Sequence, residues 1–219
     1  MKKEIDIEVK IKDFLQSVSE KTATQKTLDE VLLLMKKRFG YDNDELMMHY
    51  HNLAIDLLNA KDYELAMYLR KKHIAMSEQL FGAEDAYTVD SHSDLAHLLN
   101  VIGRYDEARE LLKKVIPFFE REYGPGELPT LIQYAELGEV LYSLGEFEQA
   151  KTQQKVVVKG WAKLYGADDP QMADYYQALA LTLQALDEKE EAAVWFQKAV
   201  SSREKHAAGT DTKGARRVR

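Results

Sequence analysis

The chain has 219 residues, of which 45% are hydrophobic and 31% are charged, with four prolines and no cysteine. This composition is typical of a globular protein, and the lack of cysteine excludes disulfide bonds and thiolate metal sites. Charged residues interrupt every apolar run well before the ~20 residues that a membrane-spanning helix needs. The net charge of −7 argues against nonspecific nucleic-acid binding by the main surface. Residues 1–6 lack the apolar core of a signal peptide, so we expect a cytoplasmic protein.

Residues 1–22 are predicted to form an N-terminal cap or arm. Apolar and charged residues alternate over residues 5–11, which is the period of a strand, whereas Ile11, Phe14 and Val18 recur at the spacing of one helix face. A single strand would have no sheet to join in a helical protein. We therefore favour a capping helix over an extended arm, with residues 4–12 compatible with either.

Residues 23–40 are predicted to form half of a repeat, with one helix from about Leu28 to Arg38. The helix ends at Phe39-Gly40, where glycine can adopt the positive φ that a helix C-terminus favours. Four apolar residues are expected to face inward: Val31, Leu32, Leu34 and Met35.

From residue 41 onward, one pattern recurs four times at a spacing of 42 residues. It contains a leucine followed by a small residue: Leu53-Ala54, Leu95-Ala96, Leu137-Gly138 and Leu179-Ala180. An alanine follows at a constant distance in every copy: Ala66, Ala108, Ala150 and Ala192. Self-similarity at a fixed period indicates a stacked-repeat solenoid. The predicted repeats are about 41–82, 83–124, 125–166 and 167–206.

Each repeat is predicted to be an antiparallel pair of helices. In the second repeat, Leu95 and Leu98 begin an apolar stripe of helical spacing, Gly103 interrupts it, and another such stripe follows. The small residues are expected where helices press together, because solenoid cores are closely packed. The second helices end at aromatic-Gly pairs: Phe81-Gly82, Tyr123-Gly124 and Tyr165-Gly166. After the last pair, Asp169 is expected to cap the next helix and Pro170 to open it.

Residues 207–219 are predicted to be a basic, disordered tail. They contain four basic residues and one acidic residue, Asp211, among small and polar residues. Such a tail could bind an acidic partner, an anionic lipid or RNA, or it could simply increase solubility. We favour the interpretation that the tail only increases solubility.

Several stretches of the chain resemble the tetratricopeptide repeat family, in the 42-residue form found in kinesin light chains and many bacterial repeat proteins. These stretches are Asn52-Leu53-Ala54, Gly103-Arg104-Tyr105-Asp106-Glu107-Ala108, Gly145-Glu146-Phe147-Glu148-Gln149-Ala150 and Leu164-Tyr165-Gly166-Ala167-Asp168-Asp169-Pro170. The resemblance covers about residues 24–206. It implies an all-α fold, a right-handed α-solenoid of antiparallel helix pairs.

In this family the first helix of each pair lines a concave face, and the resemblance indicates which positions point inward. Twelve of these positions are the candidate partner-binding residues: Met48, His51, Ile55, Asn59, Asp90, His97, Asn100, Glu139, Tyr142, Asp174, Gln177 and Leu181. The inward positions include no lysine or arginine, whereas Asp90, Glu139 and Asp174 make the face acidic. This charge favours a basic or neutral peptide or helix. It does not fit the carboxylate grip of chaperone-binding members or the basic groove of kinesin light chains. The alternative is that these acidic residues form only a solvated face.

The sequence contains no motif that predicts catalysis, a cofactor or a metal site. Four histidines fall on first helices: His49, His51, His92 and His97. The last two are five residues apart, which is a poor fit to the spacing that places two ligands on one helix face. Residues 90–94 (Asp-Ser-His-Ser-Asp) are more typical of a polar helix face than of a catalytic triad. We therefore predict no catalytic residue, no metal, no cofactor and no enzymatic activity.

We predict a protein–protein interaction module: an adaptor, scaffold or co-chaperone-like protein that binds a peptide or helix of a partner in its concave groove. The alternatives are a regulatory sensor of a short signalling peptide and a self-assembling structural repeat protein. Trp161 is expected to pack against the following repeat. Trp195 and Phe196 either fill the core of the last repeat or, if exposed, mediate a homodimer. Nucleic acid and membranes are not expected as partners.

Overall fold

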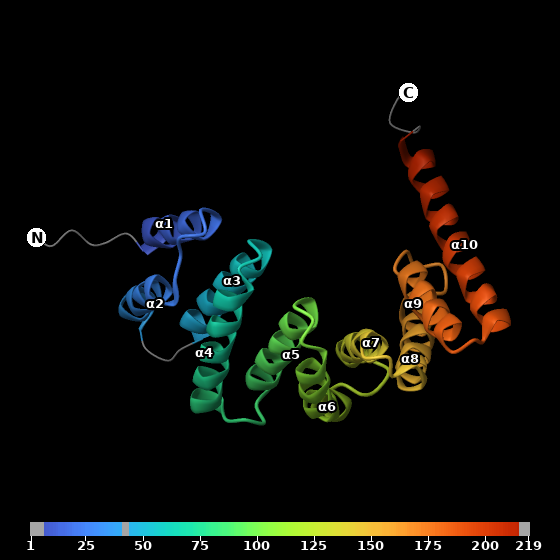
Figure 1. Ribbon diagram of the computed structural model, residues 1–219, viewed down its shortest axis with the longest axis horizontal. Coiled ribbons are helices and arrows are strands. Elements are labelled where there is room, and N and C mark those ends of the chain that lie inside the picture. The colour runs from blue at the N-terminus through green and yellow to red at the C-terminus, as the bar shows by residue number, and fades with distance from the viewer. Residues whose placement is uncertain (1–6, 41–43, 215–219) are drawn as a thin grey trace, which may run out of the picture. The chain divides into compact units, whose positions relative to one another are not determined.

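The computed structural model describes residues 7–40 and 44–214, with side chains described up to residue 205. Within these residues the regular elements are ten α-helices and no strand, so the all-α class predicted from the sequence is confirmed (Figure 1). The chain divides into two compact units, residues 1–103 and residues 104–219, which we call the N-terminal and the C-terminal unit. The boundary falls inside the predicted repeat 83–124.

The N-terminal unit contains five of the helices. These are α1 (Ile7–Ser19), α2 (Gln25–Phe39), α3 (Asp44–Asn59), α4 (Tyr63–Phe81) and α5 (Ala86–Val101). The helix α4 packs against both α3 and α5, and α1 packs against α2 and α3. The apolar faces share one core, in which Leu28, Leu46 and Leu57 are fully buried.

The helix α1 covers the beginning of this core. Ile7, Phe14 and Val18 lie on one face of α1 and are buried among residues of α2 and α3. Residues 7–12 are therefore helical, as we favoured, because the helical spacing buries three apolar side chains at once. Residues 1–6 lie outside the described residues.

The helix α2 begins three residues earlier than the sequence suggested, because Thr24 and Thr27 cap its N-terminus. The backbone N–H of Thr27 donates to the Thr24 hydroxyl at 3.2 Å, and the N–H of Thr24 donates to the Thr27 hydroxyl at 2.8 Å. Such a cap stabilises a helix by about 1 kcal/mol. Of the residues expected to face inward, Val31, Leu32 and Met35 are buried, and Leu34 is half-buried against the same core.

The C-terminal unit contains the other five helices. These are α6 (Tyr105–Glu122), α7 (Leu128–Ser143), α8 (Phe147–Tyr165), α9 (Met172–Ala185) and α10 (Lys189–Gly214). The pairs α7–α8 and α9–α10 are each joined by a short turn and packed together, and α10 extends beyond α9 (Figure 1). Two ion pairs link successive repeats at the same repeat position: Arg109 to Glu146, and Lys151 to Glu188 at 2.8 Å. Both members of the second pair lie 42 residues after those of the first.

The small residues of the repeat are buried where helices approach one another. Ala66, Ala108 and Ala150 are almost completely inaccessible. A Cβ atom added to Gly138 would lie 3.2 Å from the Gln154 side chain. These positions therefore set the distance between helices, as the repeat pattern predicted.

One turn position has a positive φ in all four repeats. It is occupied by glycine twice, at Gly103 (78°) and Gly145 (77°), and by other residues at Lys61 (60°) and Asp187 (63°). The Cβ of a non-glycine residue crowds the backbone in this conformation. The fold therefore keeps the turn even where the sequence does not favour it.

Two expectations about the last repeats are corrected. The helix α9 begins at Met172, after Pro170 rather than at it, and Asp169 accepts hydrogen bonds from the backbone N–H of Gln171 and the indole N–H of Trp161. The helix α10 continues to Gly214, where a disordered tail was expected from residue 207. Alanine favours helix, so Ala207-Ala208 extends α10 instead of ending it. Residues 215–219 lie outside the described residues.

Both tryptophans belong to the core of the C-terminal unit. Trp161 is buried, and its ring packs against Tyr175 of α9, so it contacts the following repeat as predicted. Trp195 is half-buried in the same core, with its ring 5.4 Å from that of Tyr176. Of the two alternatives given for Trp195 and Phe196, the structure therefore supports packing in the core of the last repeat.

Candidate partner-binding surfaces

The predicted binding residues lie on α3 and α5 in the N-terminal unit and on α7 and α9 in the C-terminal unit. We call these the first-helix surfaces of the two units. The exposed members are Met48, Ile55, Asn59, Asp90, His97, Glu139 and Asp174. The half-buried members are His51, Tyr142, Gln177 and Leu181. Most predicted positions are thus accessible on their own unit.

Asn100 does not belong to the accessible set. It is only 8% exposed. It lies one helical turn after Ala96, which is completely buried, and so shares the packed side of α5. Tyr142, at the same position of the next repeat, is half-buried, so the repeat pattern alone does not determine the exposure of this position. Asn100 is therefore a poor choice for a surface contact.

On α3, Met48 and Ile55 form an apolar stripe at the surface. Met48 is 57% exposed and Ile55 is 37% exposed. They are seven residues apart, which is about two helical turns, and therefore face the same direction. Between them lies His51, whose ring is part of a charged cluster.

This cluster is formed by Arg70, Asp94 and His51, one residue from each of α4, α5 and α3. The Arg70 guanidinium donates to the Asp94 carboxylate at 2.6 Å and lies 3.0 Å from Nδ1 of His51, which is also 3.0 Å from the carboxylate. The Arg70 side chain is only 7% exposed. Burial lowers the pKa of Arg70, and the Asp94 charge opposes that effect. The cluster therefore places an arginine directly beneath the first-helix surface.

Arg70 lies on a second helix and is not among the residues predicted from the sequence, which all lie on first helices. One signal was available: Arg70 and His73 interrupt the apolar side of α4 that contains Leu65, Ala66 and Leu69. A charged residue in such a stripe is buried only when it is paired. The pattern alone does not show which partner it has.

His73 lies below the same cluster and is held in its neutral form. Burial, together with the charge of Arg70 and the proximity of His51, lowers the pKa of His73 to about 4. Its Nδ1 is 3.1 Å from the Ser91 hydroxyl, and that hydroxyl donates to the carbonyl of Tyr87 at 2.7 Å. Since the hydroxyl proton is already used, the Nδ1–H of His73 donates to the Ser91 oxygen.

The surface of α5 next to this cluster is acidic. The pKa of Asp90 is raised by partial burial and by the nearby carboxylates of Asp94 and Asp85. A cationic group bound here would relieve the repulsion among these carboxylates. The negative charge of these carboxylates agrees with the acidic first-helix surface predicted from the sequence.

In the C-terminal unit, the acidic position on α9 already has a partner. Arg203 of α10 donates to Asp174 at 3.1 Å and to Gln177 at 2.5 Å. On α7, Glu139 is exposed, and the ring of Tyr142 packs 5.4 Å from that of Phe147. Two of the predicted contacts on α9 are therefore engaged by the chain's own last helix.

His49 and His92 have local packing roles. His49 stacks on Phe39 with 4.0 Å between the ring centroids, and Nδ1 of His92 lies 2.9 Å from the carbonyl oxygen of Thr88. Among the described residues, no group of three or more potential ligands is arranged to hold a metal ion. In the same part of the chain, no helix has the length and apolar character to cross a membrane.

Many solved structures share this fold, including the following three. BtubC (BKLC) from P. vanneervenii is 17% identical, with 86% of this chain and 74% of that chain covered and a TM-score of 0.72. Repeats of a putative kinesin light chain from Podosopora anserina are 19% identical, with 95% and 99% covered and a TM-score of 0.71. MamA from Desulfovibrio magneticus RS-1 is 20% identical, with 90% and 96% covered and a TM-score of 0.59. At these identities the likeness shows the fold alone.

A search of curated protein sequences gave no significant match. The sequence model of the tetratricopeptide repeat, in contrast, matches three overlapping segments, residues 44–121, 87–160 and 131–205. Together they span most of the chain and agree with the 42-residue register of the helix pairs. The chain therefore belongs to the tetratricopeptide repeat family and has its α-solenoid fold of antiparallel helix pairs.

Proposed function

We propose that this protein is an adaptor or scaffold that binds a peptide or helix of a partner protein on its first-helix surfaces. The family fold is consistent with a general protein-interaction module. The observation that carries the proposal is the apolar stripe of Met48 and Ile55, exposed on α3 beside the Arg70–Asp94–His51 cluster. Exposed apolar groups next to fixed polar ones are typical of a groove that receives a helix or peptide.

The charge of these surfaces supports a basic or neutral partner. Asp90 and Glu139 are exposed on their own units, and Arg70, beneath the first-helix surface of the N-terminal unit, is neutralised by Asp94. Acidic groups at the rim of an interface affect partner choice and association rate more than affinity. We also propose that the protein is located in the cytoplasm, as expected from the sequence.

The test is a comparison of two double variants in affinity purification from native lysate. Met48→Glu/Ile55→Glu places charges on the stripe of α3, and Val194→Glu/Val200→Glu makes the same change at exposed positions of α10. We expect a partner that the wild type and the α10 variant retain and the α3 variant loses. Retention of the same partner by all three proteins would contradict the proposal.

Self-assembly is the competing function, and a separate measurement decides it. The proposal predicts a monomer whose mass by light scattering does not change with protein concentration. A mass that increases with concentration, together with recovery of the protein itself as its main partner, would favour a structural assembly instead.

A further inference from the structure

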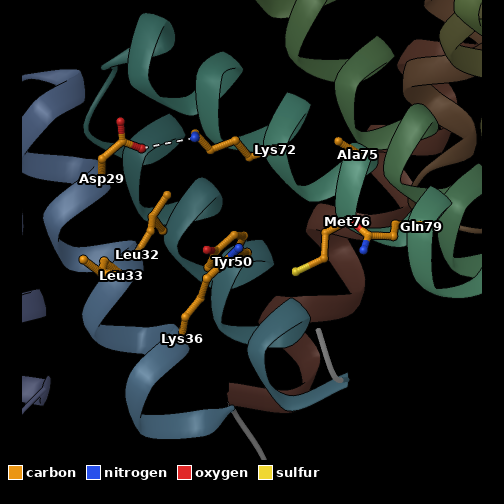
Figure 2. A pocket seen from close by; sticks show the side chains of 9 residues that line it. All are labelled: Asp29, Leu32, Leu33, Lys36, Tyr50, Lys72, Ala75, Met76 and Gln79. Carbon is orange, nitrogen blue, oxygen red and sulfur yellow. Dashed lines mark ion pairs between the residues drawn. The ribbon is translucent and has the colours of Figure 1, made fainter. Parts of the chain in front are cut away.

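A pocket of about 320 Å³ lies between α2 and α4 in the N-terminal unit (Figure 2). Its floor is apolar and consists of Leu32, Tyr50 and Met76, all of which are almost completely buried. Leu33 adds an apolar side chain that is 47% exposed. The volume is at the lower end of the range for ligand pockets, which suits one large apolar side chain better than an extended ligand.

This pocket is distinct from the first-helix surface. Tyr50 points into it from α3, whereas Met48 and Ile55 form the surface stripe of the same helix. At 3.6 residues per turn, Tyr50 is separated from that stripe by roughly 150° around the helix axis. The N-terminal unit therefore presents two separate surfaces on opposite sides of α3.

Two lysines line the pocket. Figure 2 shows Lys72 of α4 directed toward Asp29, and the Lys36 side chain extending from α2 to Tyr50. The Lys72 ammonium is 3.2 Å from the Asp29 carboxylate, which also accepts a hydrogen bond from Tyr68 at 2.8 Å. These contacts hold Lys72 in position beside the opening.

The charge of the pocket is opposite in sign to that of the whole chain. Its lining contains two lysines and one aspartate, a net charge of +1, whereas the chain carries −7. An acidic ligand would be attracted here and repelled by the acidic side of α5.

The C-terminal unit provides an internal comparison at the same repeat position. Two repeat lengths after Lys36 and Tyr50 lie Glu120 and Tyr134, and the Tyr134 hydroxyl donates to the Glu120 carboxylate. An acidic residue there replaces the lysine, whereas Asp29, Ala75 and Gln79 correspond to Lys113, Lys159 and Lys163. The combination of Lys36, Lys72 and Met76 in one lining is therefore not repeated in the C-terminal unit, where these positions hold Glu120, Val156 and Gly160.

We propose that this pocket is a second docking site, which binds an acidic segment of a partner protein. One apolar side chain of the segment enters between Leu33 and Met76 and contacts the apolar floor. Carboxylates on either side of that chain pair with Lys36 and Lys72. The protein would thereby hold two partners at once, one on the first-helix surface and one between the second helices α2 and α4.

The test uses the full chain and the peptide acetyl-Glu-Asp-Leu-Asp-Glu-amide, followed by NMR of methionine methyl groups. Met76 reports on the pocket, and Met48 reports on the first-helix surface. We expect the Met76 signal to shift on titration and the Met48 signal to stay in place. A peptide with alanine in place of leucine, and one with lysine in place of the acidic residues, should each bind more weakly.

Two pairs of variants separate the pocket from general charge. Lys36→Glu should weaken binding roughly fivefold or more, because it replaces an attraction with a repulsion, and Lys37→Glu makes the same change on the same helix outside the pocket. Leu33→Ser tests the apolar contact without any change of charge, against Met48→Ser as its control. Circular dichroism checks that each variant keeps its helix content.

Several results would overturn the proposal. Equal losses in Lys36→Glu and Lys37→Glu, or a shift of Met48 instead of Met76, would show that the pocket is not the binding site. An identical Met76 shift with a short oligothymidylate would show a site for polyanions, and Met76 shifts on dilution of the protein alone would show a contact between copies. Because Met48 is observed separately, failure here leaves the function proposed for the first-helix surface testable.

Discussion

The two units differ in the polar groups that they bury. In the N-terminal unit, the interior between α3, α4 and α5 contains an arginine and two histidines, Arg70, His73 and His92. Among the described residues of the C-terminal unit, the buried polar side chains are neutral: Thr130, Gln133, Gln154, Thr182 and Ser202. Charged pairs there, such as Lys151–Glu188, lie nearer the surface and recur with the repeat. One fold thus tolerates both a buried arginine with its own acidic partner and a part-buried ion pair that recurs with the repeat.

This difference has consequences for stability. A buried charge is compensated only while its partners remain in place, so its loss is expensive. An exposed pair is screened by water and contributes little. The N-terminal unit should therefore be the more sensitive to single substitutions of charged residues and to pH. Both tryptophans lie in the C-terminal unit, so tryptophan fluorescence reports on that unit separately.

The largest effect is expected for Asp94→Ala. The substitution leaves the Arg70 guanidinium buried without its counter-charge and should reduce the free energy of unfolding of the N-terminal unit by about 3 kcal/mol. Urea unfolding followed by circular dichroism measures the loss. The matched control is Glu188→Ala, which removes an acidic partner in the C-terminal unit and should change the unfolding midpoint far less.

A double variant shows whether the uncompensated charge is the cause. Arg70→Met/Asp94→Ala removes both charges and keeps an extended side chain in place of Arg70. It should be more stable than Asp94→Ala alone. If the double variant is less stable than the single one, the cluster acts through shape rather than through charge.

Acid should destabilise the N-terminal unit through His73. Its pKa is about 4 in the folded protein and 6.5 when unperturbed, so between these values the unfolded chain binds more protons than the folded one. The stabilisation is complete above pH 6.5 and is lost as the pH falls toward 4, by a total on the order of 2–3 kcal/mol. Urea unfolding at a series of pH values measures this slope.

A His73→Gln variant is the control for the pH dependence. Glutamine cannot take up a proton in this range, and its amide can still donate to the Ser91 hydroxyl. The variant should show a smaller loss of stability in acid than the wild type. An unchanged slope would assign the acid sensitivity to groups other than His73.

The C-terminal unit should be sensitive to packing instead. A Cβ atom added to Gly160 of α8 would lie 2.5 Å from a methyl carbon of Leu131, which is completely buried on α7. Gly160→Ala should therefore destabilise this unit by about 2 kcal/mol, because the buried Leu131 side chain or the helices themselves must shift. Tryptophan fluorescence during urea unfolding detects the change. Gly126→Ala is the control, since its added Cβ meets open space.

These contrasts also explain what could be predicted from the sequence. The 42-residue register was sufficient to place the helix pairs and buried residues such as Ala108 and Ala150, because packing depends on small residues at fixed spacing. The ion pairs Arg109–Glu146 and Lys151–Glu188 repeat with the same register and could therefore have been predicted from the sequence. The Arg70 cluster occurs once and joins three helices, so no periodicity identifies it. The pocket at Tyr50 depends on the particular side chains of α2 and α4. The burial of Asn100 depends on the rotation of α5, and the length of α10 depends on where that helix ends.

The smallest effect concerns the turn with positive φ, where each unit has one glycine and one other residue. In the C-terminal unit, Gly145→Ala should destabilise by about 1 kcal/mol, since alanine is strained there while its Cβ meets nothing within 4 Å. In the N-terminal unit, Lys61→Gly should have the opposite sign, although the greater freedom of glycine in the unfolded chain offsets part of the gain. Asp187→Gly should gain less than Lys61→Gly, because aspartate tolerates this conformation better than lysine. Thermal unfolding of the three variants measures the order of these changes in stability. If Lys61→Gly is destabilising, the lysine side chain contributes more to this turn than its backbone strain costs.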